Sequence, residues 1–243
     1  MATSYGPQYP GIQDGLVFCF DPKNKDCWKG GRTIYPISSK PTNNTGSMAT
    51  DFSDAEINTA LTTEGYFTYD GSDDRIDCGT EYNSSLQFSN PYSISTWVDL
   101  GGSGDRTMVA NLGSNYEGVQ IRGITGDKIR WVGAMQNGSV WFYVDSSALS
   151  SGWHHVVGTY NGSGHNVSNL NLYINGVLDN NATGTSGTVT TNTSTAPLYM
   201  GYGGVAYPTQ FNGDLGPCMI YNRELSAAEV MTNYNILKGR FGL

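Results

Sequence analysis

The sequence predicts a single all-β domain with one short helix at its C-terminal end. The composition is rich in turn-forming residues: 32 of the 243 residues are glycine, and only 14% are charged. This mixture is typical of β proteins and unlike that of a helical bundle or a disordered chain. Short runs of β-branched and aromatic residues recur between turns, and only the last segment shows the hydrophobic period of a helix.

The expected strands follow one another at short spacing along the chain. The clearest is YSISTWVDL, in which Ile94 and Val98 alternate with Ser95 and Trp97. Because neighbouring side chains of a strand point to opposite faces, these two sets belong to different faces. The expected strands span residues 15–21, 66–70, 75–79, 92–100, 107–113, 118–124, 128–135, 139–145, 153–160, 170–176, 197–203 and 218–224.

The helix is expected within LSAAEVMTNYNILKG, residues 225–239. Ser226 and Glu229 have the spacing of a capping box, which satisfies backbone N–H groups at the start of a helix. The apolar side chains that follow share one helical stripe, at Val230, Met231, Tyr234 and Leu237.

Residues 1–14, MATSYGPQYPGIQD, are expected to form an extended N-terminal arm ahead of one domain at residues 15–243. The segment carries two prolines, which lack a backbone donor and bias the preceding residue to extended conformations. It therefore cannot pair continuously in a sheet. We expect the arm to order on a partner and to attach the domain to a larger assembly.

Charge and hydropathy exclude several classes of protein. The net charge of −8 and the isoelectric point near 4.7 do not suit a nucleic-acid partner. No run of about 18 apolar residues is present for membrane insertion. The first residues lack the features of a secretory signal, so we expect cytoplasmic synthesis without export. The cysteines, Cys19, Cys27, Cys78 and Cys218, are accordingly expected to be reduced and mostly buried.

Six stretches of the chain occur in the same order as similar stretches in members of a known family. They are YFTYDGSDDRIDCG, YSISTWVDL, SGWHHVVGTYNGS, LNLYINGVLDNN, PLYMGYGG and FNGDLGPCMIYNRELSAAEV. The chain resembles the concanavalin A-like lectin/glucanase superfamily, in its laminin-G-like branch, over about residues 15–235. The resemblance implies a two-sheet antiparallel jelly-roll sandwich, with a concave outer face on which relatives bind sugars. The chain ends, DGLVFCFDPKNKDCW and YNRELSAAEVMTNYNILKGRFGL, also resemble those of such domains in structural proteins of tailed bacteriophages.

The adjacent histidines of SGWHHVVGTYNGS are expected to be structural. On a strand, His154 and His155 point to opposite faces, so they cannot share a metal ion. The resemblance also implies that Trp153 packs in the fold and that the following histidine bonds to backbone. Trp97 is expected in the core, between the two sheets.

Catalysis is not expected from the sequence. Retaining glucanases of this fold place acidic residues alternately on one strand, about 5 Å apart. No stretch of the sequence has their Glu-x-Asp-x-x-Glu type of pattern, and neither a Gly-x-Ser-x-Gly elbow nor a phosphate-binding loop occurs. These observations predict a protein that is not an enzyme and that needs no cofactor.

An acidic turn, DGSDDRID, is the best candidate for a metal site. Carboxylate oxygens crowded on one turn suit Ca²⁺. Asp-Gly and Asp-Asp are also ordinary turn residues, and Arg75 lies within the cluster, so turn formation is the favoured interpretation. The candidate ligands are Asp70, Asp73, Asp74 and Asp77.

A second candidate is an outward face that carries aromatic side chains. KIRWVGAMQNGSVWFYVD is expected to form a hairpin at Asn137-Gly138. Its second strand places apolar residues on one side and aromatic residues on the other, where they suit stacking on sugars. Packing against a neighbouring subunit or against the N-terminal segment fits equally well. The candidate residues are Trp141, Tyr143, Asp145, Tyr116, Tyr202 and Tyr207.

Two functions from different classes follow. The first is a bacteriophage virion structural protein, in a capsid decoration, head fibre or tail fibre, which contacts other virion proteins through residues 1–14. For this first function we also expect the protein to form a homo-oligomer and to adhere to cell-surface glycans. The alternative is a soluble carbohydrate-binding lectin module that is not part of a virion.

Overall fold

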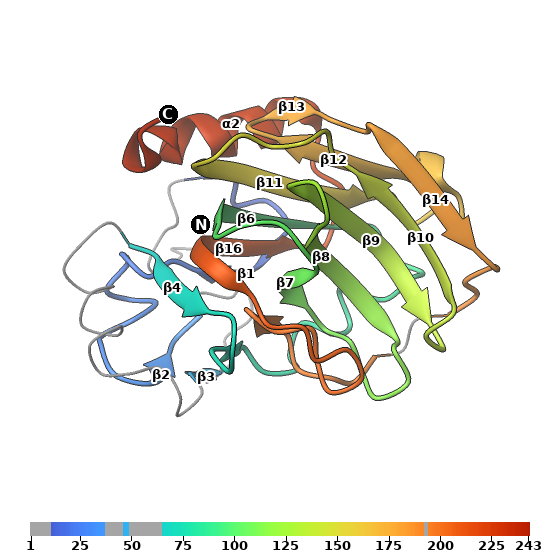
Figure 1. The fold of residues 1–243 in the computed structure, drawn as a ribbon, viewed down its shortest axis with the longest axis horizontal. Helices are drawn as coiled ribbons and strands as arrows, with labels where there is room; N and C mark the ends of the chain where they lie inside the picture. Colours follow the sequence, from blue (N-terminus) through green and yellow to red (C-terminus); the bar gives the residue numbers. More distant parts are fainter. Residues whose placement is uncertain (1–10, 37–45, 49–64, 192–193) are drawn as a thin grey trace, which may run out of the picture.

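The protein folds as a sandwich of two antiparallel sheets with one C-terminal helix, as the sequence predicts (Figure 1). The computed structural model describes residues 11–36, 46–48, 65–191 and 194–243. The first ten residues of the expected arm lie outside this part of the chain. Within the described residues, no helix is long and apolar enough to cross a membrane.

The first sheet, called sheet A here, carries the two ends of the domain. Its long central strands are β6 and β16, which pair in antiparallel register. A short strand, β4, pairs with β16 outside the main order. In spatial order the strands are β1 (Leu16–Phe20), β16 (Asn212–Tyr221), β6 (Tyr92–Leu100), β11 (Trp153–Tyr160), β12 (Leu170–Ile174) and β13 (Val177–Leu178), with β4 at Phe67–Asp70.

The second sheet, sheet B, is built from the middle of the chain and from short edge strands. A single-turn helix, η1 (Val167–Asn169), precedes β12 of sheet A. In spatial order the strands of sheet B are β14 (Ala182–Ser186), β10 (Val140–Asp145), β9 (Lys128–Gln136), β8 (Gly118–Ile124), β7 (Arg106–Ala110), β15 (Tyr199–Met200), β5 (Ile76–Asp77), β3 (Gly46–Met48) and β2 (Thr33–Ile34).

The main core lies between the two sheets and is rich in aromatic side chains. Trp131 of β9 is fully buried there, and its indole donates to the Thr159 carbonyl at 3.1 Å. A Cβ atom at Gly158 would lie 2.4 Å from the Trp131 ring, so glycine at this position lets the indole approach the facing sheet. This contact packs the two sheets closely against each other where β9 faces β11.

A second apolar layer covers the outer face of sheet A. Helix α2 (Ala227–Leu237) and the short helix η2 (Lys238–Phe241) supply one side of it. Trp97 is fully buried in this layer, with its ring centroid 4.4 Å from that of Phe241. The expectation that Trp97 packs between the sheets is therefore wrong. Ile94 and Val98 face the main core, and the two-residue period of the strand turns Trp97 to the opposite side.

Helix α2 begins as the sequence predicts. The Ser226 hydroxyl accepts from the Glu229 backbone N–H, and the Glu229 carboxylate accepts from the Ser226 backbone N–H. Arg223 pairs with the same carboxylate at 2.6 Å, which lowers the pKa of Glu229 to about 2. Val230 and Leu237 are buried against sheet A.

The described end of the expected N-terminal arm lies against this helical layer. The Ile12 backbone N–H donates to the Asn233 side chain at 2.9 Å, and the Tyr221 hydroxyl donates to the Ile12 carbonyl. Asp14 pairs with Arg223 at 2.9 Å. Residues 12–14 are therefore held to the C-terminal end of the domain.

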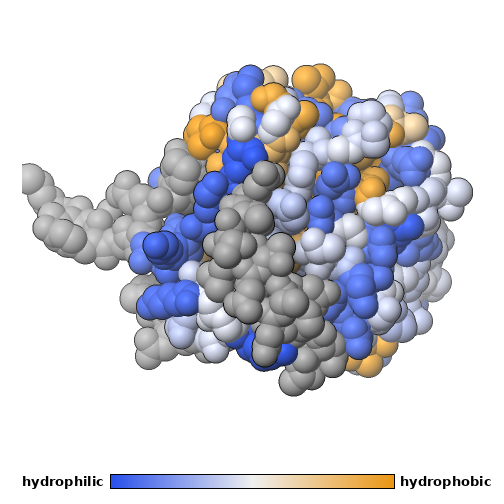
Figure 2. Space-filling model, turned by 60° about the vertical axis from the view of Figure 1, so that its left-hand side comes forward, coloured by the Kyte–Doolittle hydropathy of each residue, from blue (hydrophilic) through white to orange (hydrophobic). Residues whose placement is uncertain are grey.

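All four cysteines are buried, as the sequence predicts for side chains that fill space. Burial raises the pKa of the Cys218 thiol well above its ordinary value. The face of the molecule in Figure 2 is mainly polar where it is coloured, and apolar side chains appear there in small groups.

Candidate functional site

The outer face of sheet B carries most of the expected ligand-binding side chains. Cross-strand pairing places Tyr143 of β10 opposite Val132 of β9, Val132 opposite Gln120 of β8, and Gln120 opposite Ala110 of β7. A second row, next to the first, runs from Asp145 through Arg130 to Arg122. The face is therefore a continuous surface across four strands.

Four aromatic side chains gather on this face and are called the aromatic face below. They are only partly buried, and they come from a loop before β8, from β10 and from the loop before β16. They pack on a floor of buried apolar residues, Ala110, Leu112, Val132 and Met135. The four residues of the aromatic face are Tyr116, Trp141, Tyr143 and Tyr207.

Two glycines permit this arrangement. A Cβ atom at Gly184 of β14 would lie 2.4 Å from the Tyr143 ring, so the ring lies directly over the backbone of the edge strand. At the three-residue hairpin turn between Gln136 and Val140, Asn137 and Gly138 both have a positive φ, of 53° and 67°, which asparagine and glycine adopt more readily than other residues. A Cβ atom at Gly138 would lie 3.0 Å from the Tyr116 ring.

Asp145 lies on the expected side of β10 but is engaged by a neighbour. Arg130 donates to both of its carboxylate oxygens, at 2.7 and 2.8 Å. The guanidinium also lies 3.7 Å from the centroid of the Tyr143 ring. Burial acts to lower the pKa of Arg130, but the hydrogen bonds with Asp145 outweigh it and raise the pKa. Asp145 therefore fixes Arg130 and Tyr143 in place.

Tyr207, one of the four residues of the aromatic face, contacts a second arginine. Its hydroxyl donates to Asp105 at 3.0 Å and accepts from Arg122. Burial raises the pKa of Tyr207, so the phenol is neutral at pH 7. Arg122, Arg130 and Asp105 were not predicted from the sequence. The two-residue alternation in GVQIRGI and KIRWVGAM carries the signal that places both arginines on one face.

Tyr202 does not pack on the floor of the aromatic face. Its ring lies against Tyr199, with centroids 5.3 Å apart, and Arg75 lies over it at 5.3 Å. Tyr199 pairs with Ala110 across β15 and β7, so Tyr202 is separated from the aromatic face by another ring.

Three of the four expected calcium ligands come together. The carboxylates of Asp70, Asp73 and Asp74 lie within 4.8 Å of one another, whereas Asp77 is not part of this group. Asp74 accepts from the Asp70 backbone N–H at 2.8 Å, and Asp70 accepts from the Ser72 backbone N–H at 2.7 Å. Asp77 accepts from the Gly79 backbone N–H at 2.8 Å. These hydrogen bonds are typical of a turn. They occupy carboxylate oxygens, so the cluster offers fewer free oxygen atoms than the six to eight that Ca²⁺ takes as ligands.

The adjacent histidines have separate partners on opposite faces of β11. His155 bonds to the Ser95 hydroxyl at 2.8 Å within the layer under α2, and burial lowers its pKa to about 3. His154 contacts the Ser150 carbonyl at 3.0 Å and the Asn175 side chain. Their arrangement is structural.

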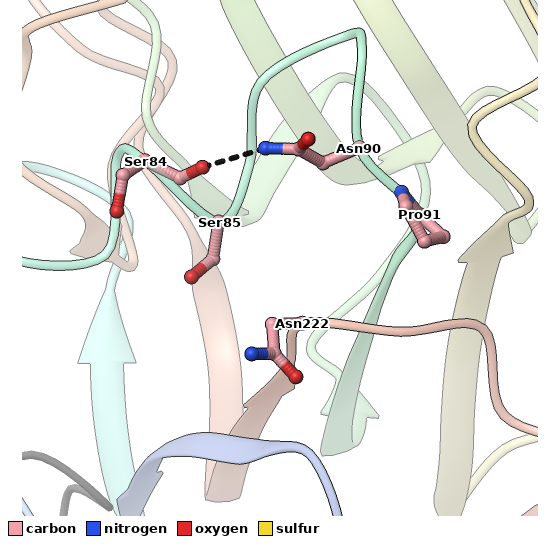
Figure 3. A pocket seen from close by; sticks show the side chains of 5 residues that line it. All are labelled: Ser84, Ser85, Asn90, Pro91 and Asn222. Atoms are coloured by element: carbon pink, nitrogen blue, oxygen red, sulfur yellow. Dashed lines mark hydrogen bonds between the residues drawn. The ribbon is translucent and has the colours of Figure 1, made fainter.

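A small polar hollow lies at one end of the sandwich (Figure 3). Its cavity volume is about 340 Å³, and a side chain of Asn90 donates to the Ser84 carbonyl at 2.9 Å across its rim. Figure 3 shows Asn222 on the opposite side of the hollow from Asn90. The hollow was not predicted from the sequence, because its lining comes from segments that are distant along the chain. It is lined by Ser84, Ser85, Asn90, Pro91 and Asn222.

Comparisons with known proteins support the fold assignment. A family model described as the concanavalin A-like lectin/glucanases superfamily matches residues 70–231. A comparison with curated proteins finds no match. Among solved structures, a Trypanosoma rangeli sialidase in complex with 2,3-difluorosialic acid aligns at a TM-score of 0.62 and 12% identity, covering 93% of this chain and 33% of the sialidase chain.

A second solved structure is the receptor binding domain of botulinum neurotoxin C/D mosaic serotype. It aligns at a TM-score of 0.61 and 16% identity, and the match covers 91% of this chain and 51% of that one. At such identities the likeness shows the shared fold alone. The chain thus spans a third to a half of the length of these structures.

These neighbours correct one expectation. The missing glucanase spacing led us to predict a protein that is not an enzyme, but solved structures with this fold include sialidases. The fold is therefore compatible with an enzyme. The physical reason is that a missing spacing excludes only the mechanism that requires it.

Proposed function

Because the chain belongs to the concanavalin A-like lectin/glucanases superfamily, we propose that it binds carbohydrate on the outer face of sheet B. The observation that carries the proposal is the aromatic face, in which four partly exposed rings share one apolar floor. The flat C–H surfaces of sugars stack on such rings, and nearby polar groups hydrogen-bond the hydroxyls.

The polar groups beside the rings suit this role. The Arg130–Asp145 pair lies against Tyr143, and the Arg122–Asp105 pair contacts Tyr207. Both pairs offer donors and acceptors within reach of the rings. A surface that only packs on another subunit is usually depleted of charged residues at its centre, and this composition favours a sugar over a subunit.

Replacing Trp141 tests the proposal. We expect Trp141→Ala to reduce binding to the glycans that the wild-type protein recognises on an array by roughly fivefold to thirtyfold, because loss of a stacking ring removes about 1–2 kcal/mol. The melting temperature should change little, since Trp141 is only partly buried. The matched control is Tyr35→Ala, which removes another ring that is 38% exposed.

Two results would contradict the proposal. One is a wild-type protein that binds no glycan on a broad array. The other is a folded Trp141→Ala protein that binds glycans as the wild type does. If the wild type is a dimer that the substitution dissociates, the aromatic face belongs to a subunit interface.

A virion is the setting that we propose for this binding. The support is the resemblance of both chain ends to those of tailed-bacteriophage structural proteins. In this setting the protein is made in the host cytoplasm and joins a capsid decoration, a head fibre or a tail fibre. Other virion proteins are its partners, and the domain adheres to host-surface glycans.

Mass spectrometry of separated heads and tails tests the virion setting. The expected result is a stoichiometric amount of the protein in one of the two fractions. Its absence from washed particles, combined with retained glycan binding, would favour the alternative of a soluble lectin module.

A further inference from the structure

We propose that the Arg122 end of the aromatic face binds a carboxylate, so that the preferred ligand is an acidic sugar. This inference rests on the proposed function and adds the chemical class of the ligand. It comes from a difference between the two arginines of the face. Arg122 and Arg130 lie directly opposite each other on β8 and β9, where two like charges repel unless each is compensated.

Arg130 is fully compensated, whereas Arg122 is not. Arg130 makes two short hydrogen bonds to Asp145, whose side chain is 11% exposed. The nearest carboxylate of Arg122 is that of Asp105, 3.7 Å away and 51% exposed. A carboxylate at that distance and exposure compensates the guanidinium weakly. Arg122 is therefore the cation that can accept another anion.

Buried polar atoms beside Arg122 support the same conclusion. The Arg122 Nε atom and the Gln120 Oε1 atom are buried and have no hydrogen-bond partner. Gln120 is fully buried, and its amide nitrogen donates to Thr107 at 2.6 Å. Buried polar groups without partners are uncommon in folded proteins and often mark functional positions. Both residues project from the same side of β8 as the floor of the aromatic face.

Tyr207 places this cation next to the rings. Its ring lies 5.3 Å from the Arg122 guanidinium and packs on the same floor as Tyr143. A sugar stacked on the aromatic face therefore has its edge beside Arg122. Its carboxylate would replace Asp105 and the Tyr207 hydroxyl as acceptors, with the paired geometry that guanidinium and carboxylate groups favour.

The overall charge of −8 is compatible with an anionic ligand. Exposed charges farther away than about 8 Å are screened at physiological ionic strength. The contact with Arg122 is short-ranged, so it acts at the site even though the chain as a whole is acidic.

The experiment compares acidic glycans with forms in which the carboxyl is reduced to an alcohol. Two sets are used, one ending in hexuronic acids and one in sialic acids, because both carry the same group. We expect the wild-type protein to bind the acidic form of one set roughly tenfold to a hundredfold more tightly than its reduced form. The set that shows the preference identifies the source of the carboxylate.

Two variants of opposite sign test the role of Arg122. We expect Arg122→Gln to abolish the preference for the acidic form while binding of the reduced form persists. Asp105→Asn removes the competing carboxylate from an exposed position, so it should increase affinity for the acidic form alone. Lys128→Gln is the control, because it removes one positive charge from the same sheet without contacting Tyr207.

The outcomes separate this inference from the proposed function. Equal binding of acidic and reduced glycans by the wild type overturns the inference but leaves carbohydrate binding in place. A preference for the acidic form that survives Arg122→Gln also overturns it. Absence of binding to every glycan contradicts both proposals.

Discussion

The indole of Trp97 joins a strand of sheet A to the end of the chain. Its ring centroid lies 4.4 Å from Phe241, 4.9 Å from His155 and 5.9 Å from Tyr234. One side chain therefore contacts β11, α2 and η2 at once. The two-residue alternation of the strand predicted from the sequence which residues share a face with Trp97. The layer that covers this face was not predictable, because the segment that supplies it lies more than a hundred residues away along the chain.

We expect Trp97→Ala to lower the free energy of unfolding by about 3–5 kcal/mol, because it leaves a cavity beneath the helical layer. Urea unfolding followed by circular dichroism measures this loss. Ile236→Ala, on the exposed side of α2, is the control and should change stability by much less. Equal stabilities of the two variants would show that the layer does not depend on Trp97.

His155 makes the stability of the fold depend on pH. Burial lowers its pKa to about 3, whereas a histidine in an unfolded chain titrates near about 6.5. Between these values the unfolded chain binds more protons, so the free energy of unfolding falls as the pH decreases from about 6.5 toward 3. Glu229, whose pKa is lowered to about 2, further reduces the free energy of unfolding when it is protonated, but only at pH values below the ordinary pKa of glutamate.

We expect His155→Gln to be less stable at pH 7, because the bond to Ser95 is lost, and to lose less stability between pH 6.5 and 5. The measurement is chemical unfolding at several pH values in this window. His165→Gln serves as the control and should keep most of the wild-type slope. Parallel slopes for wild type and His155→Gln would contradict the assignment.

The hairpin of β9 and β10 is the element that carries the aromatic face. Its turn, its alternation and its apolar side were predicted from the sequence, and strands β6, β8 and β11 have the predicted bounds. Strand β14, ATGTS, was not predicted, because small polar residues give little strand signal. The partner of Asp145 was missed for a different reason. The length of the turn and an irregularity between Phe142 and Tyr143 together set the register that places Arg130 opposite Asp145, and the irregularity has no signal in the sequence.

We expect Gly138→Ala to destabilise the hairpin for two reasons, a positive φ of 67° and a Cβ contact of 3.0 Å with Tyr116. Gly126→Ala has a positive φ of 85° but no atom within 4 Å of its Cβ, so it isolates the backbone cost of about 1 kcal/mol. The extra loss in Gly138→Ala, measured by thermal unfolding, reports the ring contact. A matching loss in glycan binding is expected only for Gly138→Ala. Identical behaviour of the two variants would show that Tyr116 does not depend on this turn.

At the scale of the whole molecule, the sandwich and its C-terminal helix were predictable because the long strands and the capping box have local signals. The gathering of the aromatic face was predicted in part. Four of its five expected rings meet on one floor, and Tyr202 contacts Tyr199 instead. That difference arises in the loop after β15, where neither a two-residue nor a helical period applies.

Truncation tests the role of the N-terminal segment. We expect deletion of residues 2–10 to leave the domain folded with an unchanged melting temperature, because the contacts of Ile12 and Asp14 are kept. If the segment attaches the protein to a particle, the truncated protein should no longer join it. Deletion of residues 2–14 should also lower the melting temperature, since it removes those contacts. Normal incorporation of the shorter truncation would place the attachment on the domain surface.

The helical layer gives the sandwich two unlike sides. Residues 12–14, α2 and η2 cover the outer face of sheet A, whereas the aromatic face lies on the outer face of sheet B. A partner bound next to residues 12–14 and η2 would therefore lie on the side of sheet A, and the rings of sheet B would face the opposite side. Mounted in many copies on a support, the domain would display its rings away from the support without any hinge or reorientation, and weak single contacts would add up over the array.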